Sequence, residues 1–123
     1  MRFLNISNHP SARWDEKQKQ AALSFGAGEI VDIQFPNVPP TSTERELEEL
    51  CRLITGTISQ QDIVHVMGEM GLTYKIVSVL RAKQVETFHS TTERIVEEVD
   101  GKKVVRFEFV QFRPYFWLAN LSY

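Results

Sequence analysis

The chain alternates between two hydrophobic periods, and each period predicts one kind of element. Short runs rich in apolar and β-branched residues are typical of buried strands. These runs lie at 1–7, 29–35, 63–67 and 85–89. Between them, apolar residues recur every three or four positions, which is the spacing of the buried face of a helix. These helix-like stretches cover 11–25, 41–58 and 72–84. Strands that alternate with helices predict βαβ units and a mainly parallel sheet.

Polar and glycine-containing segments predict where the helices begin and end. Thr41 and Glu44 have the spacing of a capping box, so we expect the second helix to start there. Gly56 weakens that helix near its end. The segment 68–71 carries two glycines and forms a tight turn, after which the third helix is expected to begin at residue 72 or 73.

The last third of the chain has a different pattern. Asp100-Gly101 separates two alternating, β-branched runs, 93–99 and 102–112, which is a strong signal for an antiparallel hairpin. The aromatic tail from Arg113 to Tyr123 either packs on the core or forms a subunit contact, and the sequence leaves both open. We therefore predict an α/β fold: a single three-layer Rossmann-like domain over 1–123, with a mainly parallel sheet and a C-terminal antiparallel β-hairpin.

Composition and charge narrow the function classes. Hydrophobic residues make up 42% of the 123 residues, enough for a core, and the formal net charge is −2. This charge gives no general attraction to duplex nucleic acid or to an anionic membrane, so we expect neither as a partner. We find no signal-peptide core and no apolar run of the roughly 18 residues that cross a bilayer, so we expect a soluble cytoplasmic protein. Cys51 is the only cysteine and lies in an apolar helical stripe, which favours a buried, inert thiol.

The sequence contains no recognisable metal or cofactor motif. No two histidines have the spacing of helical metal ligands and no Asp/Glu cluster stands out, so no metal site is expected. The segment 68–71 lacks both the phosphate-loop ending and the GxGxxG dinucleotide fingerprint, and no GxSxG nucleophile elbow is present. We therefore expect no cofactor.

Three polar segments follow predicted strands at their carboxyl ends. They are 8–11, 68–71 and 90–94. In an open α/β sheet, ligands bind outside these strand ends, where helix N-termini offer free N–H groups. We expect the three segments to converge on one ligand site.

The first segment offers small hydrogen-bonding side chains. Ser7, Asn8 and His9 either contact a ligand or cap the following helix. His9 is the candidate proton carrier of a catalytic site, because the ordinary pKa of histidine is about 6.5. His65 alternates within the central strand and is expected either to be packed or to reach a neighbouring helix, and His89 is a weaker candidate than His9.

The turn after the central strand contributes three further candidates. Gly68 lets a ligand approach the backbone closely. Glu69 can accept from a ribose hydroxyl or a base edge, act as a catalytic base, or simply interact with the helix dipole. Thr73 lies in the first helical turn, where it can cap the helix or contact the ligand.

The third segment combines hydroxyls with a cation. Ser90, Thr91 and Thr92 supply donors and Arg94 supplies a forked guanidinium, which suits a phosphate-holding loop. The alternative is a simple turn into the hairpin, with Arg94 paired to Glu93 or another neighbour.

These features together resemble one protein family, the small stand-alone CRISPR-associated Rossmann-fold (CARF-like) proteins of type III systems, of the ring nuclease type. The resemblance rests on Asn5 to Pro10 with Trp14 and a Gln-rich helix behind it, on Val66 to Glu69, and on 90–94 with the hairpin. The first loop departs from a strong phosphate site because it lacks a lysine or arginine.

The resemblance implies binding of a cyclic oligoadenylate, the second messenger of type III CRISPR antiviral defence, across a homodimer. It also implies metal-independent phosphodiesterase activity in some members, through attack of a ribose 2′-hydroxyl on its own phosphodiester. Ser7, Asn8, His9 and 90–94 would then hold phosphates, and Gly68 and Glu69 would meet ribose or adenine. The alternative is a non-catalytic interaction module that acts through the aromatic hairpin and tail, 107–123.

Overall fold

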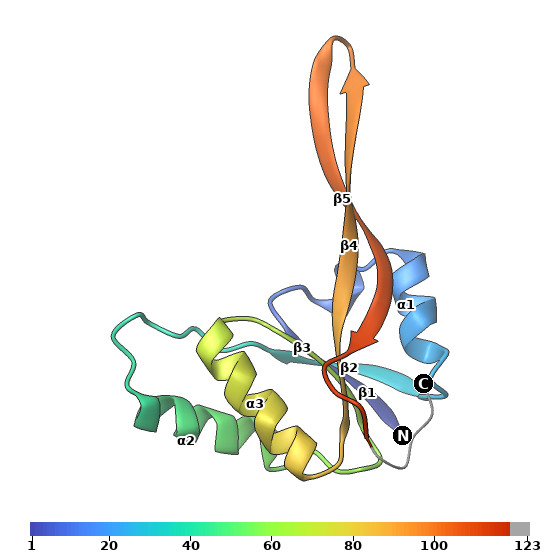
Figure 1. The fold of residues 1–123 in the computed structure, drawn as a ribbon. Helices are drawn as coiled ribbons and strands as arrows, with labels where there is room; N and C mark the ends of the chain where they lie inside the picture. The colour runs from blue at the N-terminus through green and yellow to red at the C-terminus, as the bar shows by residue number, and fades with distance from the viewer. Residues whose placement is uncertain (119–123) are drawn as a thin grey trace.

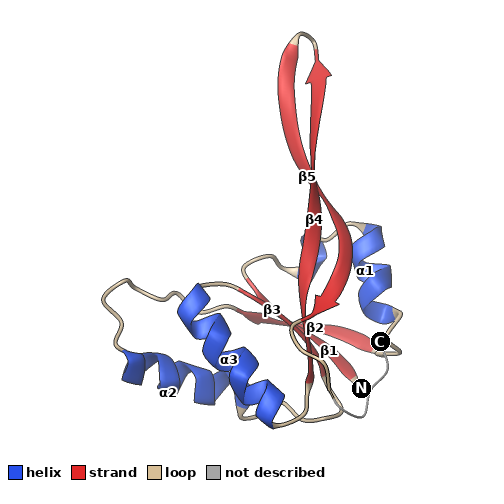
Figure 2. Ribbon diagram, in the orientation of Figure 1, coloured by secondary structure: helices blue, strands red, loops and turns tan. Residues whose placement is uncertain are grey.

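Figure 1 shows a five-stranded sheet with helices packed against it and a long β-hairpin that projects away from the body. The computed structural model describes residues 1–118. The strands are β1 (Arg2–Ser7), β2 (Glu29–Gln34), β3 (Ile63–Met67), β4 (Glu86–Val99) and β5 (Lys102–Pro114). The helices are α1 (Glu16–Leu23), α2 (Glu44–Thr55) and α3 (Met70–Ala82), with a short 3-10 turn η1 (Ser11–Arg13) before α1. Figure 2 marks these elements by type.

The strand order is β2-β1-β3-β4-β5. β1 runs parallel to both β2 and β3, and β3 runs parallel to β4, whereas β5 pairs with β4 in the antiparallel direction. The chain therefore moves from β1 to β2 on one side and returns to β3 on the other side of β1. This reversal places a topological switch point between β1 and β3. The predicted α/β class, with a mainly parallel sheet and a terminal hairpin, is confirmed.

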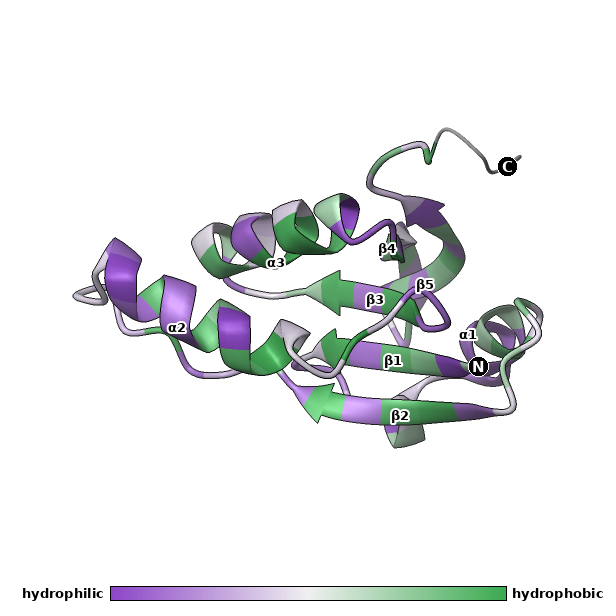
Figure 3. Ribbon diagram, turned by 90° about the horizontal axis from the view of Figure 1, so that it is seen from below, coloured by the Kyte–Doolittle hydropathy of each residue, from purple (hydrophilic) through white to green (hydrophobic). Residues whose placement is uncertain are grey.

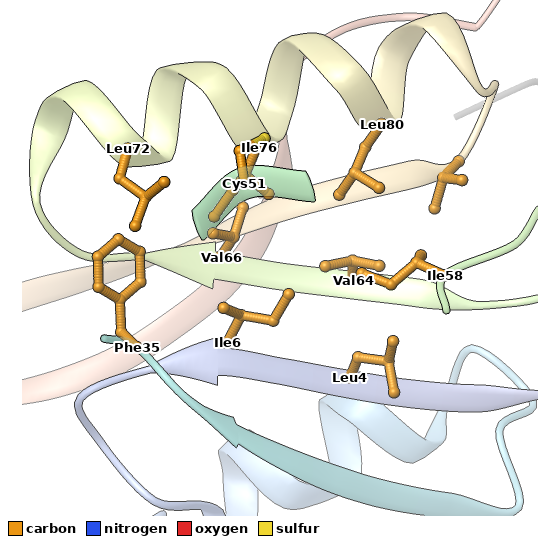
Figure 4. Packing of buried hydrophobic residues seen from close by; sticks show 11 residues of the cluster. Leu4, Ile6, Phe35, Cys51, Ile58, Val64, Val66, Leu72, Ile76 and Leu80 are labelled. Carbon is orange, nitrogen blue, oxygen red and sulfur yellow. The ribbon is translucent and has the colours of Figure 1, made fainter. Parts of the chain in front are cut away.

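Each face of the sheet has its own hydrophobic core. Side chains alternate between the faces along a strand, so even-numbered residues of β1 and β3 meet α2 and α3, and odd-numbered residues meet α1. The first core includes Leu4, Ile6, Val64, Val66, Leu72, Ile76 and Leu80 (Figure 4). The second core includes Phe3, Trp14, Ala22, Ile63, Phe88, Phe109 and Phe112. Two aromatic residues of β5, Phe109 and Phe112, thus belong to the core on the α1 face.

The second helix begins later than its predicted cap. Thr43 is the N-cap: its hydroxyl accepts from the Glu46 N–H at 3.2 Å, and its own N–H donates to Glu46 Oε1 at 3.1 Å. The capping box predicted at Thr41 and Glu44 is therefore wrong by two residues. The same residue types recur two positions later, at Thr43 and Glu46. Figure 3 shows hydrophobic and hydrophilic segments alternating along α2, as expected of an amphipathic helix.

The third helix begins earlier than predicted. α3 starts at Met70, not at residue 72 or 73, because Glu69 caps it. Glu69 Oε1 accepts from the Leu72 N–H at 2.7 Å. The carboxylate thus pairs with one of the N–H groups that the first turn of a helix leaves unpaired.

Gly68 is required by the packing of the protein itself. A Cβ at this position would overlap the ring of Phe35, which is buried at the end of β2. On this side of the Gly68 backbone, the Phe35 ring therefore occupies the space in which a ligand was expected.

β4 is much longer than predicted, and its length overturns the loop expected at 90–94. The strand continues from Glu86 to Val99 and pairs with β5 as far as the turn, with a register shift between Thr91 and Thr92. Pairing with β5 holds these hydroxyl residues extended, although the same residue types are common in turns. Asp100 and Gly101 have φ values of 51° and 76°, as the predicted tight turn requires.

The tail packs on the body as far as it is described. The Tyr115 hydroxyl donates to the Val66 carbonyl at 2.6 Å, and the Tyr115 N–H donates to the Thr87 carbonyl at 3.0 Å. Leu118 is buried. The packing alternative therefore holds up to Leu118, and the rest of the predicted tail, 119–123, lies outside the described residues.

We predict that Gly68→Ala lowers the free energy of unfolding by about 1–3 kcal/mol, because the added methyl group displaces the Phe35 ring from a packed core. Gly28→Ala is the matched control, since a Cβ there meets no atom within 4 Å. Urea denaturation of both variants checks this prediction. Equal stability of Gly68→Ala and wild type would show that the ring is free to move aside.

Candidate functional site

Four polar side chains form a row across the sheet on the face covered by α1. They come from four neighbouring strands: Asp32 on β2, Asn5 on β1, His65 on β3 and Ser90 on β4. Asn5 lies opposite Asp32 in one strand pair and opposite His65 in the other. Asn5 and His65 are only 1% and 2% exposed. We call these four residues the polar row.

Asn5 is the centre of the polar row because its amide is bonded on both sides. Its Nδ2 donates to Asp32 Oδ1 and to the His9 carbonyl, each at 2.9 Å. Its Oδ1 accepts from the Ser7 hydroxyl at 2.8 Å. Both partners of Nδ2 are acceptors, so the amide cannot be turned over without placing oxygen against oxygen. The orientation of Asn5 is therefore fixed.

This orientation determines the tautomer of His65. His65 Nδ1 lies 2.9 Å from Asn5 Oδ1, which can only accept, so Nδ1 carries the proton. Nε2 is then an acceptor and lies 3.2 Å from the Ser90 hydroxyl. The rings of Trp14 and Phe112 stand against the imidazole, at centroid distances of 5.7 and 5.3 Å. Hydrogen bonds and aromatic contacts together hold one ring orientation.

The two ionisable groups of the polar row have shifted pKa values. Burial, together with the nearby His89 and His9, lowers the pKa of His65 to about 4. The imidazole is therefore neutral at pH 7. Partial burial acts to raise the pKa of Asp32, but hydrogen bonds from Asn5 and Ser11 outweigh it and leave that pKa below its ordinary value. Asp32 consequently remains a carboxylate.

A cavity of about 410 Å³ opens beside the polar row, at the carboxyl ends of β1 and β3 and next to β4. We call it the polar cavity. Its lining residues are Ser7, Asn8, His9, Gln18, His65, Met67, Gly68 and Ser90. It lies at the switch point between β1 and β3, where α/β sheets bind ligands. We expected 8–11, 68–71 and 90–94 to converge at one sheet edge. Asn8, His9, Gly68 and Ser90, which come from all three segments, do line the same cavity.

A second cavity, of about 350 Å³, adjoins the same strand end from the α3 face. We call it the apolar cavity, and its lining residues are Met67, Gly68, Met70, Thr73, Tyr74, Val77 and Tyr115. Thr73 does not cap α3, and its buried hydroxyl has no hydrogen-bond partner among residues 1–118. Burial raises the pKa of Tyr115 to about 12, so its hydroxyl keeps its proton. Met67 and Gly68 line both cavities and divide one from the other.

Glu69 does not line either of these cavities. Its carboxylate caps α3 and lines a third hollow of about 290 Å³ together with Asn8 and 34–38. Of the roles considered for Glu69, the structure supports the interaction with the N-terminus of α3. The catalytic role predicted for Glu69 therefore has no geometric support, because the carboxylate is engaged away from the polar cavity.

Only the first residue of 90–94 reaches the polar cavity. The Thr91 hydroxyl donates to the Gln111 carbonyl at 3.4 Å. Thr92 and Arg94 are exposed on the hairpin, where they pair with Phe109 and Phe107 of β5. The guanidinium expected beside a phosphate thus lies outside the cavity of its own chain, because the strand carries it past the sheet edge.

Sequence reasoning missed three members of the site. It treated His65 as a packed residue, and it did not single out Asn5 or Asp32. A signal was present, since Asn5 and His65 are polar residues inside apolar strands and both occupy positions on the same face. Gln18 of α1 also lines the polar cavity, and it is buried.

Within 1–118, no group of three or more His, Cys, Asp or Glu side chains could hold a metal ion. In the same part of the chain, no helix is both long and apolar enough to cross a bilayer.

We predict that stability falls by up to about 1.4 kcal/mol per pH unit as the pH drops from 6.5 to 4, through His65. In this window the unfolded histidine binds a proton and the folded one does not. His65→Gln keeps a donor and an acceptor but removes the titration, so its stability should vary less with pH. Urea denaturation at several pH values tests this, and equal pH dependence in variant and wild type would contradict the burial of a neutral imidazole.

Comparison with known proteins places the whole arrangement in a family. The model of the family described as Uncharacterized protein MJ1673 matches residues 1–113, which include all three helices and the four parallel strands. Uncharacterized protein MJ1673 of Methanocaldococcus jannaschii is 29% identical over 87 residues, covering 66% of this chain and 67% of that protein. The chain belongs to the MJ1673 family.

Proposed function

We propose that this protein binds a cyclic oligoadenylate second messenger of type III CRISPR defence at the polar cavity, and cleaves it without a metal ion. The observation that carries the proposal is the position of that cavity at the switch point between β1 and β3. A volume of about 410 Å³ falls within the range of roughly 300–1,000 Å³ typical of small-molecule sites.

The finer description of the fold belongs to the same proposal. α1 packs on one face of the sheet and α2 with α3 on the other, which supports a three-layer Rossmann-like domain. In such domains the strand ends at the switch point bind nucleotides. The resemblance of 5–10 and 66–69 to CARF-like proteins supports the same kind of ligand.

The two cavities suit the two chemical parts of an adenylate. The polar cavity offers hydroxyl, amide and imidazole groups that can hydrogen-bond ribose and phosphate oxygens. The apolar cavity offers Tyr74, Tyr115 and Met70, against which an adenine ring can pack. Neither cavity is lined by Lys or Arg, so each phosphodiester, with its single charge, would be held by neutral donors.

A ring of several nucleotides is larger than these cavities and requires a second copy of the chain. In the proposed homodimer, the hairpin residues Thr91, Thr92 and Arg94 reach the ring only if the two-fold axis brings them near the partner's cavity. In that arrangement Arg94 would contact a phosphate in the partner's cavity, although it lies outside the cavity of its own chain. The proposed place of action is the cytoplasm.

A second candidate function rests on the projecting hairpin. Phe107 is 65% exposed, and Val96 and Val105 lie beside it as a directly opposed pair. An exposed apolar strip of this kind is typical of a contact surface. In this alternative the protein is a non-catalytic interaction module, and the aromatic hairpin binds a partner.

We predict that cyclic tetra-adenylate or cyclic hexa-adenylate, added in the presence of chelator, raises the melting temperature of the wild type. His9→Ala should weaken binding roughly tenfold, because it removes a cavity side chain worth about 1.4 kcal/mol. His89→Ala is the matched control, since His89 accepts from Arg113 and packs on Tyr115 outside the polar cavity. Absence of any shift with both rings would favour the interaction module.

A further inference from the structure

We propose that Ser90 is the nucleophile of this site, activated by His65 and attacking a phosphodiester of the bound nucleotide. The inference deepens the proposed function, because it assumes a nucleotide in the polar cavity. It departs from the 2′-hydroxyl attack that the family resemblance implies. What carries it is the connected geometry of a hydroxyl, a base and a group that orients the base.

The distances have the order that such a relay needs. Ser90 Oγ lies 3.2 Å from His65 Nε2, and His65 Nδ1 lies 2.9 Å from Asn5 Oδ1. Asn5 is in turn held by Asp32 at 2.9 Å. Ser90 and His65 both line the polar cavity, so a phosphorus atom placed there can meet the hydroxyl. Asn5 is a positioning residue, since it is buried beside the histidine and does not line the cavity.

The proton of the Ser90 hydroxyl has two acceptors to choose from. Met67 Sδ is 3.0 Å from Ser90 Oγ and also accepts from the Ser90 N–H at 3.4 Å. A thioether is a weak acceptor, whereas a neutral imidazole nitrogen is a strong one. The Asn5 amide keeps the Nδ1 proton in place, so Nε2 is free to accept. The hydroxyl therefore points its proton at the base.

The reaction balances with water as the only co-reactant. Ser90 Oγ forms a bond to phosphorus, the bond from phosphorus to one ribose oxygen breaks, and His65 Nε2 passes the serine proton to that leaving oxygen. Water then attacks the phosphorus of the serine ester, gives a proton to His65, and the Oγ–P bond breaks as that proton returns to Ser90. The product is a linear oligonucleotide with a terminal phosphate. An anionic phosphate in the cavity stabilises the imidazolium that forms in each step.

A ring made of 2′-deoxyadenylate separates this route from attack by a 2′-hydroxyl. We expect the wild type, in chelator, to cleave both cyclic tetra-adenylate and its 2′-deoxy analogue, and to leave terminal phosphate without cyclic phosphate. Ser90→Ala should lose at least roughly 100-fold in turnover. Ser24→Ala, which removes an exposed hydroxyl that donates to the Ala21 carbonyl and lines neither cavity, should stay within about twofold of wild type. Chromatography with mass spectrometry reads the products, and thermal shift reads binding.

Two results would overturn the proposal while leaving ligand binding intact. One is a 2′-deoxy ring that binds but is not cleaved, and the other is a Ser90→Ala variant that cleaves at the wild-type rate. If neither ring binds, the proposed function fails, and a fluorophosphonate probe decides the inference alone. Labelling of Ser90 in the wild type, with loss of the label in His65→Gln, would support an activated serine; an unlabelled Ser90 would refute it.

Discussion

One set of hydrogen bonds between neighbouring strands constrains the rest of this structure. Asn5 is buried in the middle of the sheet, and a buried amide left unpaired costs about 1–3 kcal/mol for each group. The cost is avoided because Asp32, Ser7 and His65 bond to it from three directions. That arrangement sets the register of side chains across β2, β1 and β3, and it leaves the acceptor nitrogen of His65 facing Ser90.

The order of the strands explains why a cavity lies next to these hydrogen bonds. β1 and β3 pair up to their carboxyl ends, and beyond them the chain leads from β1 to α1 and from β3 to α3 on the opposite face (Figure 1). On the α3 side, Phe35 packs against Gly68 and Glu69 caps α3, and the apolar cavity lies beside them. The polar cavity opens on the α1 side, where His65 and Ser90 of the polar row line it.

Much of the fold could be predicted from the sequence, because periodicity records which face of each element is buried. The central strand and the Asp-Gly turn are where the pattern indicates. The strand at 90–94, where a loop was expected, could not be predicted, because it depends on pairing with β5 from a more distant part of the chain. The site was only half predictable: Ser7, Asn8 and His9 follow a strand end, whereas the role of His65 depends on its neighbours on two other strands.

Nitrogen-15 NMR of the His65 imidazole at pH 7 tests this account most directly. The polar row requires the proton on Nδ1, with a bond to Asn5, and a lone pair on Nε2 directed at Ser90. We expect a protonated Nδ1 and an unprotonated Nε2, with the same ring returning to a mixture of tautomers in Asn5→Ala. A proton on Nε2 in the wild type would contradict the hydrogen-bond chain and the activation of Ser90 together.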